Sequence, residues 1–205
     1  RSVALRSRFV DVPQLDDSDL VRLGAAHFQA GCAPCHGAPG LPRNPIVRNM
    51  LPPPPDLSHA VNAWSDRQLF WIIDNGLKYT GMPAWPAPAR KDEVWAMVAF
   101  LRQLPALEAE AYGVLAYGGS NPAVDAPRHA GWSADLLACS RCHDSAERPP
   151  ASRLVPRLAG QSPAYFAAAL RAYQSGRRQS GIMQPLAAGL DGAAIAALAN
   201  HYAPL

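Results

Sequence analysis

Apolar side chains recur along this chain at intervals of three and four residues, the spacing of one face of a helix. The clearest example is segment 94–104, where valine, methionine and leucine side chains form a single stripe. A thinner stripe of alanine, leucine and tyrosine runs along 194–202. No segment alternates convincingly between apolar and polar residues, so the pattern predicts an all-α fold.

Other helices are indicated by residues that favour helix ends. In segment 64–76, Ser65 and Gln68 can form a capping box. In segment 161–176, Ser162 stands just before a proline at the favoured first helical position. A glycine closes each of the two segments, as expected for a helix end.

The elements follow the same order in both halves of the chain. Each half has an opening helix (19–32 and 129–139), a capped helix, a methionine in the next loop and a closing helix. This repetition predicts two units, and the prolines and glycines of 105–127 mark a connection with room for a short helix over 107–117. The predicted divisions are 1–17, an N-terminal tail or tether remnant; 18–105, the first domain; 106–127, the linker; and 128–205, the second domain.

The motif Cys-x-x-Cys-His occurs once in each half, eight residues after a glycine, Gly24 or Gly131. Residues at i, i+3 and i+4 share a helix face, so two thiols can reach a flat macrocycle while the imidazole reaches its centre. The pattern favours two covalently bound haem c groups, each held by two thioether bonds and a histidine ligand to iron. The residues concerned are Cys32, Cys35, His36, Cys139, Cys142 and His143.

Two other chemistries use closely spaced cysteines. A zinc site needs four ligands, and the two cysteine pairs are more than a hundred residues apart, far outside zinc-finger spacing. A redox dithiol more often follows a strand in a βαβ pattern, which this sequence lacks. The haem interpretation is therefore favoured.

The second axial ligand of each iron is predicted to be a methionine, Met82 in the first half and Met183 in the second. Each lies in a loop that contains glycine or proline, after the capped helix, where a side chain can turn inward. Met97 belongs to the apolar stripe of a helix, and Met50 in the proline-rich loop is a weaker candidate. The competing histidines, none of which repeats between the halves, are His27, His59, His129 and His201.

Proline carbonyls are candidates to orient the ligating histidines. A ligating imidazole usually donates its other N–H to a carbonyl or carboxylate. Pro55 and Pro156 occupy corresponding positions in the two halves, so we expect their carbonyl groups to accept from His36 and His143. The neighbouring prolines 52–54 are interpreted as a stiff loop wall.

Charge and hydropathy exclude some functions. Residues 1–104 carry 11 basic and 9 acidic side chains, and residues 105–205 carry 8 and 7. No basic stripe with interleaved aromatic residues is present, so nucleic acid is not an expected partner. The longest apolar run, 94–101, is too short to cross a bilayer. The absence of an initiator methionine and of a signal segment suggests a mature or truncated form, from which any export signal or anchor has been removed.

Residues 18–205 resemble class I c-type cytochromes in tandem. The second half, with "CSRCHD", "VPRLAGQSPAYFAAALRAYQSGRR" and "MQPLAAGLDGAAIAALANHYA", is similar to a domain of the periplasmic dihaem cytochromes of the "c-four" kind. The first half, with "CAPCHG", "PPDLS", "LFWIIDNGLKYTGMPAW" and "DEVWAMVAFLRQL", resembles the cytochrome domains of bacterial respiratory enzymes.

The resemblance implies three main helices around each haem, with the first and last in close contact. Gly24 would then meet the Phe100/Leu101 region, and Gly131 the Tyr202 region. It also implies methionine ligands and export to the periplasm. The unlike halves, the long linker and the long proline-rich loop depart from the "c-four" pattern.

The function expected from these features is electron transfer without catalysis, between a respiratory donor and a terminal acceptor such as an oxidase. A cytochrome subunit permanently bound to a dehydrogenase or oxidase is the first alternative. The second is a dihaem enzyme, such as a peroxidase or a thiosulfate-oxidising enzyme. A catalytic haem needs an open or unusual sixth ligand, whereas all four cysteines serve attachment and each half has a well-placed methionine.

Overall fold

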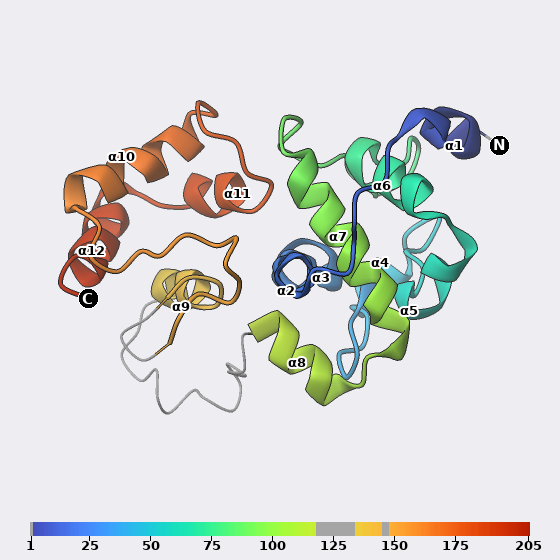
Figure 1. The fold of residues 1–205 in the computed structure, drawn as a ribbon, viewed down its shortest axis with the longest axis horizontal. Coiled ribbons are helices and arrows are strands. Elements are labelled where there is room, and N and C mark those ends of the chain that lie inside the picture. Colours follow the sequence, from blue (N-terminus) through green and yellow to red (C-terminus); the bar gives the residue numbers. More distant parts are fainter. Residues whose placement is uncertain (1, 118–133, 145–147) are drawn as a thin grey trace.

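The computed structural model describes residues 2–117, 134–144 and 148–205. These residues form helices joined by turns and loops, and none of them lies in a β-strand. The prediction of an all-α fold is confirmed. Figure 1 shows two lobes: residues 2–117 make the first lobe, and the described residues from 134 onward make the second lobe.

The first lobe is built around the crossing of α2 and α7 (Figure 1). These are the opening and closing helices that were expected to be in close contact. A Cβ at Gly24 would collide with the backbone carbonyl of Ala96 and would lie 2.7 Å from the Phe100 Cβ. Only glycine permits this approach, and the contact lies in the expected region. The helices of this lobe are α1 (Ser2–Arg6), α2 (Ser18–His27), α3 (Ala33–His36), α4 (Pro45–Arg48), α5 (Leu57–Ala60), α6 (Asp66–Asn75), α7 (Lys91–Gln103) and α8 (Ala109–Tyr117).

The opening helix of the first lobe changes its winding before the motif. It is an α-helix up to His27, then a π-helical turn over Phe28–Cys32, and then the short α3. Turns of this kind occur frequently at functional sites. The sequence pattern predicted the helical segment but not its wider turn.

Helix α8 belongs to the core of the first lobe. Its Tyr112 is 1% exposed, lies edge-on to Phe28 and donates a hydrogen bond to Gln29 Oε1 at 2.5 Å. The short helix expected within 107–117 is present, and it packs on α2. The assignment of 106–127 to a linker stays a prediction, although its first part contributes to this core.

The N-terminal segment packs on the first lobe. Helix α1 and the turn after it contact α6, and the Arg67 side chain donates to the Arg8 carbonyl at 3.2 Å. Val10 and Leu15 lie against the hydrophobic core. These contacts hold the described part of the N-terminal segment against the first lobe.

The second lobe contains a smaller core. Phe166 and Tyr202 stack with ring centroids 5.7 Å apart, joining the capped helix to the closing helix. Gly131, expected to meet the Tyr202 region, lies outside the described residues. The helices of this lobe are α9 (Ala134–Ser140), α10 (Pro163–Gln174), α11 (Met183–Ala188) and α12 (Gly192–Tyr202).

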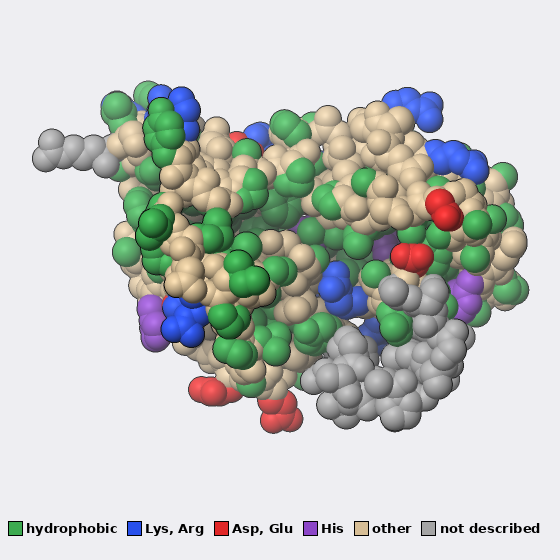
Figure 2. Space-filling model, turned by 180° about the vertical axis from the view of Figure 1, so that it is seen from behind, with side chains coloured by type: hydrophobic (Ala, Val, Ile, Leu, Met, Phe, Trp, Pro, Cys, Tyr) green, Lys and Arg blue, Asp and Glu red, His purple; other side chains and the backbone are tan. Residues whose placement is uncertain are grey.

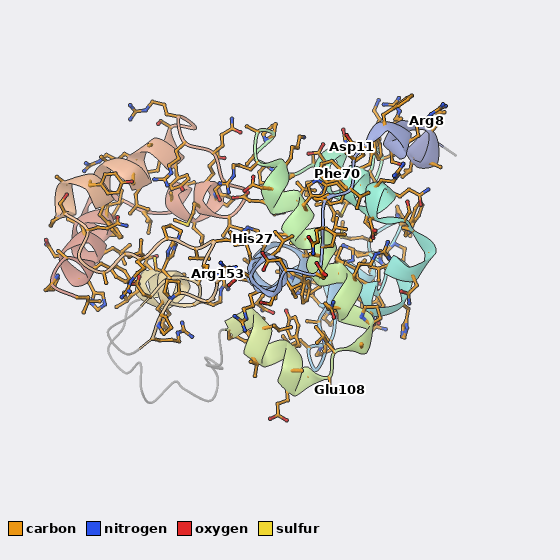
Figure 3. The ribbon with its side chains drawn as sticks, in the orientation of Figure 1. Arg8, Asp11, His27, Phe70, Glu108 and Arg153 are labelled. Carbon is orange, nitrogen blue, oxygen red and sulfur yellow. The ribbon has the colours of Figure 1, made fainter. Side chains whose placement is uncertain are left out.

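The two lobes are in direct contact. The Ser152 hydroxyl donates to the Asp19 carbonyl at 2.8 Å, and the Arg153 backbone N–H donates to the Asp19 carboxylate at 3.0 Å. The Arg153 guanidinium also pairs with this carboxylate, and Figure 3 shows its side chain beside α2. Cys142 packs against a small apolar cluster that includes Leu23 of the first lobe.

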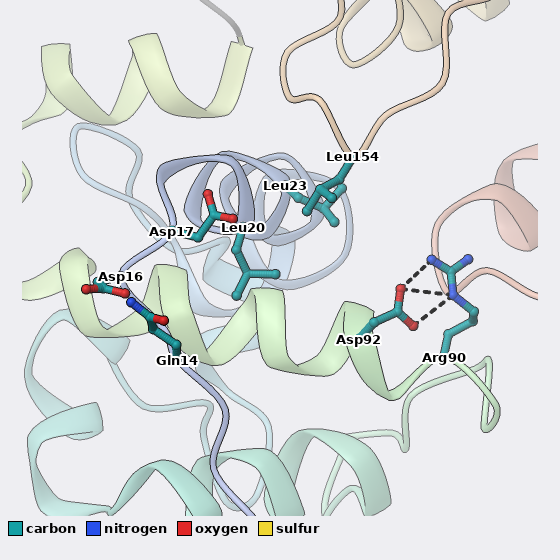
Figure 4. Close-up of a pocket in the computed structure, with 8 residues that line it drawn as sticks. All are labelled: Gln14, Asp16, Asp17, Leu20, Leu23, Arg90, Asp92 and Leu154. Atoms are coloured by element: carbon teal, nitrogen blue, oxygen red, sulfur yellow. Dashed lines mark hydrogen bonds and ion pairs between the residues drawn. The ribbon is translucent and has the colours of Figure 1, made fainter.

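A groove of about 710 Å³ runs beside this contact (Figure 4). It does not include either cysteine motif. Its lining residues are Gln14, Asp16, Asp17, Leu20, Leu23, Arg90, Asp92 and Leu154.

Neither a membrane-spanning helix nor a patch of one charge sign marks the described part of the chain in the views given. Among the described residues, no helix combines the length and the hydrophobicity that a membrane span requires. On the face drawn in Figure 2, basic and acidic side chains are interspersed, and hydrophobic side chains are spread over both lobes.

Candidate functional site

The first motif lies where the π-helical turn meets α3. Cys32, Cys35 and His36 are each partly exposed, and Cys32 packs against the main apolar core of the first lobe. The one-turn spacing of the motif directs these side chains from a single helical face. The structure therefore brings the three predicted residues together.

A proline carbonyl orients the first histidine. His36 Nδ1 lies 2.9 Å from the Pro55 carbonyl oxygen, so Nδ1–H donates and Nε2 keeps a free lone pair. Burial lowers the pKa of His36, and the Arg43 charge adds to this, while the Pro55 hydrogen bond opposes it. Arg43 also donates to the Pro54 carbonyl at 2.5 Å and so fixes the proline-rich loop. A neutral imidazole with a free Nε2 is the form that binds iron.

Met82 is held by a tight turn at the end of α6. The Leu77 N–H donates to the Met82 carbonyl at 3.1 Å, and the Met82 N–H donates to Thr80 Oγ1 at 3.1 Å. Gly76 begins the turn with φ 66°, and a Cβ there would lie 2.7 Å from the Met82 carbonyl oxygen. The Met82 side chain packs against the same core cluster as Cys32.

The second motif repeats the arrangement at the end of α9. The backbone N–H groups of Cys142 and His143 both donate to the Cys139 carbonyl, at 3.2 and 3.0 Å. His143 is buried, and its Nδ1 donates to the Pro156 carbonyl at 2.8 Å. Burial lowers the pKa of His143, which favours the neutral imidazole.

Met183 begins α11 in the second lobe. Its backbone N–H donates to Ser180 Oγ at 3.2 Å, and the Ser180 N–H donates to the Gln184 side chain at 3.1 Å. Met183 and Cys139 pack against the same apolar cluster. The relation of Met82 to Cys32 in the first lobe is thus repeated.

Asp144 is a positioning residue that the sequence analysis did not identify. Its side chain is 1% exposed and accepts from the Leu158 and Ala159 backbone N–H groups, at 2.5 and 3.2 Å. These bonds hold the chain just after Pro156, whose carbonyl orients His143. The sequence held no local signal for this role, because Asp144 stands among polar residues and its backbone donors lie 14 and 15 positions further along the chain.

The thiols of Cys32 and Cys139 are in environments that disfavour a reactive thiolate. Burial raises the pKa of Cys32 to about 12, with a further contribution from Cys35. Burial likewise raises the pKa of Cys139 to about 11, with contributions from Asp135 and Cys142. A redox dithiol relies on a lowered thiol pKa, so these environments fit apolar attachment sites better than exchange chemistry.

The structure also places the other candidate ligands that lie among the described residues. Met97 is 1% exposed within α7, as its stripe predicted. His59 lines an open cavity of about 670 Å³ that borders His36 on the side of the proline loop. Met50 reaches Gly81, so its side chain lies beside the residue that precedes Met82. His201 forms an edge contact with Tyr202, and His129 lies outside the described residues.

His27 occupies a special position at the junction of the lobes (Figure 3). It is 6% exposed, and both of its ring nitrogens lack a hydrogen-bond partner within the described part of the chain. Its ring centroid lies 5.9 Å from that of Trp85, three residues after Met82. Burial lowers the pKa of His27 to about 3, and Arg90 contributes in the same direction.

The residues present fit a covalent haem. In each lobe, a motif cysteine and a methionine face one apolar cluster, and a proline carbonyl fixes the histidine in the tautomer that leaves Nε2 available. This donor set, carried on packed helices, is the kind that c-type cytochromes use.

The comparison with protein families leads to the same class. Residues 19–101 match the family described as "Cytochrome C oxidase, cbb3-type, subunit III". Electron transfer, covalent haem and iron binding are the properties that this family implies for the matched part of the chain.

Two curated relatives match parts of the chain. The chain is 33% identical over 95 residues to the thiosulfate dehydrogenase electron acceptor of Stutzerimonas stutzeri (strain A1501), covering 46% of this chain and 38% of the relative. It is 43% identical over 68 residues to cytochrome c-552 of Acidithiobacillus ferridurans, covering 31% and 30%. The aligned parts thus span less than half of either relative. No solved structure matches the chain.

Proposed function

We propose that this chain is a periplasmic dihaem electron carrier with one haem c in each lobe. The observation that carries the proposal is the repeated geometry of histidine, proline carbonyl and methionine in both lobes. In this proposal Cys32, Cys35, Cys139 and Cys142 form the thioether bonds. His36 and Met82 ligate one iron, and His143 and Met183 ligate the other.

The haem iron, when bound, supplies a centre that accepts and releases one electron. The chain's own residues hold it in place and shield it. The Pro55 and Pro156 carbonyls orient the histidines, burial favours their neutral form, and the apolar clusters exclude water. A methionine and a histidine in each lobe would ligate the iron and raise its reduction potential, which suits transfer rather than catalysis.

The partners in this proposal are redox proteins. The matched family is named for an oxidase subunit, and one relative is named as the electron acceptor of a thiosulfate dehydrogenase. A respiratory dehydrogenase is therefore the proposed donor, and an oxidase is the proposed acceptor. The same names support the second candidate, a cytochrome subunit fixed to such an enzyme. A dihaem enzyme is less well supported, because in each lobe a methionine packs against the same apolar cluster as a motif cysteine.

Spectra of the purified holoprotein test this proposal. Mass spectrometry should show two covalent haems, and the Cys139→Ala/Cys142→Ala variant should retain one. The oxidised protein should show low-spin haem with sulfur–iron charge-transfer absorption, and the reduced protein should not bind carbon monoxide. A single haem, or carbon monoxide binding at either site, would contradict the proposal of a dihaem carrier.

A further inference from the structure

The loops that carry Met82 and Met183 meet at the junction of the lobes. The Ala89 backbone N–H donates to the Gln179 side-chain oxygen at 3.0 Å, and the Arg90 guanidinium donates to the Gln179 carbonyl at 3.1 Å. These bonds join the segment after Met82 to the segment just before Met183. The residues that the two bonds join are separated by 90 and by 89 positions in the sequence.

A buried carboxylate lies at the centre of this contact. Glu93 is 2% exposed, and its Oε2 accepts from Trp85 Nε1 at 3.1 Å and from the Gly181 backbone N–H at 2.6 Å. Its Oε1 lies 3.0 Å from the Arg90 guanidinium. One carboxylate thus binds a residue three positions after Met82 and another two positions before Met183.

The two residues that donate to Glu93 Oε2 also pack directly on each other. A Cβ at Gly181 would overlap the indole ring of Trp85, so the Gly181 backbone lies directly on that ring. On the first lobe, the Trp85 backbone N–H donates to the Ile73 carbonyl at 3.1 Å. On the second lobe, Ser180 accepts from the Met183 N–H, so the residue next to Gly181 is bonded to the methionine's own backbone.

From these contacts we propose that Glu93 is a positioning residue for both methionines, and that it couples the stability of the two axial bonds. The inference rests on the proposed function, in which Met82 and Met183 ligate iron. A charged hydrogen-bond acceptor in a buried site binds its donors strongly, and its loss leaves several donors unsatisfied at once. A change made in the first lobe should therefore loosen the methionine of the second lobe.

The decisive experiment measures the methionine–iron bond of the second lobe alone. In the Met82→Ala holoprotein, the remaining sulfur–iron band reports on Met183. Adding Glu93→Ala should weaken that band and raise the affinity of imidazole for the second haem about tenfold, the effect of losing one charged hydrogen bond. Glu93→Gln, which keeps one acceptor oxygen, should give a smaller change. Glu110→Gln, at an exposed carboxylate on α8, is the matched control and should leave the band and the affinity unchanged.

The reciprocal experiment starts from the second lobe. In the Met183→Ala holoprotein, adding Gly181→Ala should push on Trp85 and weaken the Met82 band. This variant keeps the inference testable if the Glu93 variants do not fold. An unchanged remaining band and imidazole affinity in both double variants would overturn the coupling. Absence of any sulfur–iron band in Met82→Ala alone would instead contradict the assignment of Met183 as a ligand.

Discussion

Gly76 shows how one residue decides where a methionine lies. Its φ of 66° is in the region that glycine tolerates, and the space beside it is filled by the turn that ends at Met82. Gly176 has a similar φ of 71° in the second lobe, but nothing lies within 4 Å of its missing Cβ. Both glycines therefore need a positive φ, but only at Gly76 would a side chain collide with its neighbours.

We expect Gly76→Ala to destabilise the protein by about 1–3 kcal/mol through backbone strain and to weaken the Met82 sulfur–iron band by displacing the turn. Gly176→Ala should cost a similar backbone strain and leave both bands intact. Denaturation with urea and absorption spectra of the two variants provide the measurement. Equal loss of the Met82 band in both would contradict the steric argument.

His27 makes stability depend on pH. Its native pKa of about 3 lies below the ordinary value of 6.5, so the unfolded chain binds a proton that the native chain does not. Stability therefore falls as the pH drops below about 6.5 and keeps falling towards pH 3. The charged groups that act on it are Arg90, Asp92 and Arg141.

Replacement by an apolar residue should remove this dependence. Between pH 6.5 and pH 5 the His27 contribution amounts to about 2 kcal/mol, so His27→Leu should lose correspondingly less stability over that range. Urea denaturation of wild type and variant at pH 7.5 and pH 5 measures the difference. Parallel pH profiles would show that His27 titrates normally.

At the scale of elements, helix ends were predictable and long-range contacts were not. Ser65 and Gln68 form the expected capping box, and Ser162 accepts from the Tyr165 N–H at 3.3 Å, because these contacts involve residues three positions apart. The pairing of each motif histidine with a proline carbonyl followed from the repeat. The Glu93–Gly181 bond joins residues 88 positions apart, so it depends on how the lobes pack and had no local signal.

Helix α8 offers a test of which element completes the first core. Tyr112→Ala should cost about 3–5 kcal/mol by leaving a cavity against Phe28 and Phe100. Tyr112→Phe should cost about 1 kcal/mol, because it removes only the hydrogen bond to Gln29. Stability measurements on both variants separate packing from hydrogen bonding. A negligible loss in Tyr112→Ala would mean that α8 does not stabilise the first lobe.

At the scale of the whole molecule, polar contacts between described residues join the lobes at more than one place. The first is the Glu93 contact, and the second is formed by Asp19 with Ser152 and Arg153. At a third, the Arg148 guanidinium donates to the Tyr117 carbonyl at 2.7 Å. The Arg153 hydrogen bonds lower the pKa of Asp19. The junction thus joins α2 and α7 to the loops of the second lobe.

Asp19→Ala should loosen the contact that Asp19 makes with Ser152 and Arg153. Hydrogen exchange should become faster at residues 152–155, because the Arg153 N–H loses its acceptor. Exchange within α10, away from the junction, serves as the internal control. Unchanged exchange at 152–155 would show that this contact does not hold the lobes together.

The close fit of Gly181 on Trp85 also limits how such a molecule can diversify. Cytochrome domains are compact units that recombination could exchange freely if their surfaces were independent. Suppose that a second lobe from another protein replaced this one and carried a side chain at position 181. That side chain would collide with the Trp85 indole, which cannot move without disturbing its hydrogen bond to Glu93. Exchange of one half alone therefore requires a compensating change in the other, and the two halves are constrained to evolve as a matched pair.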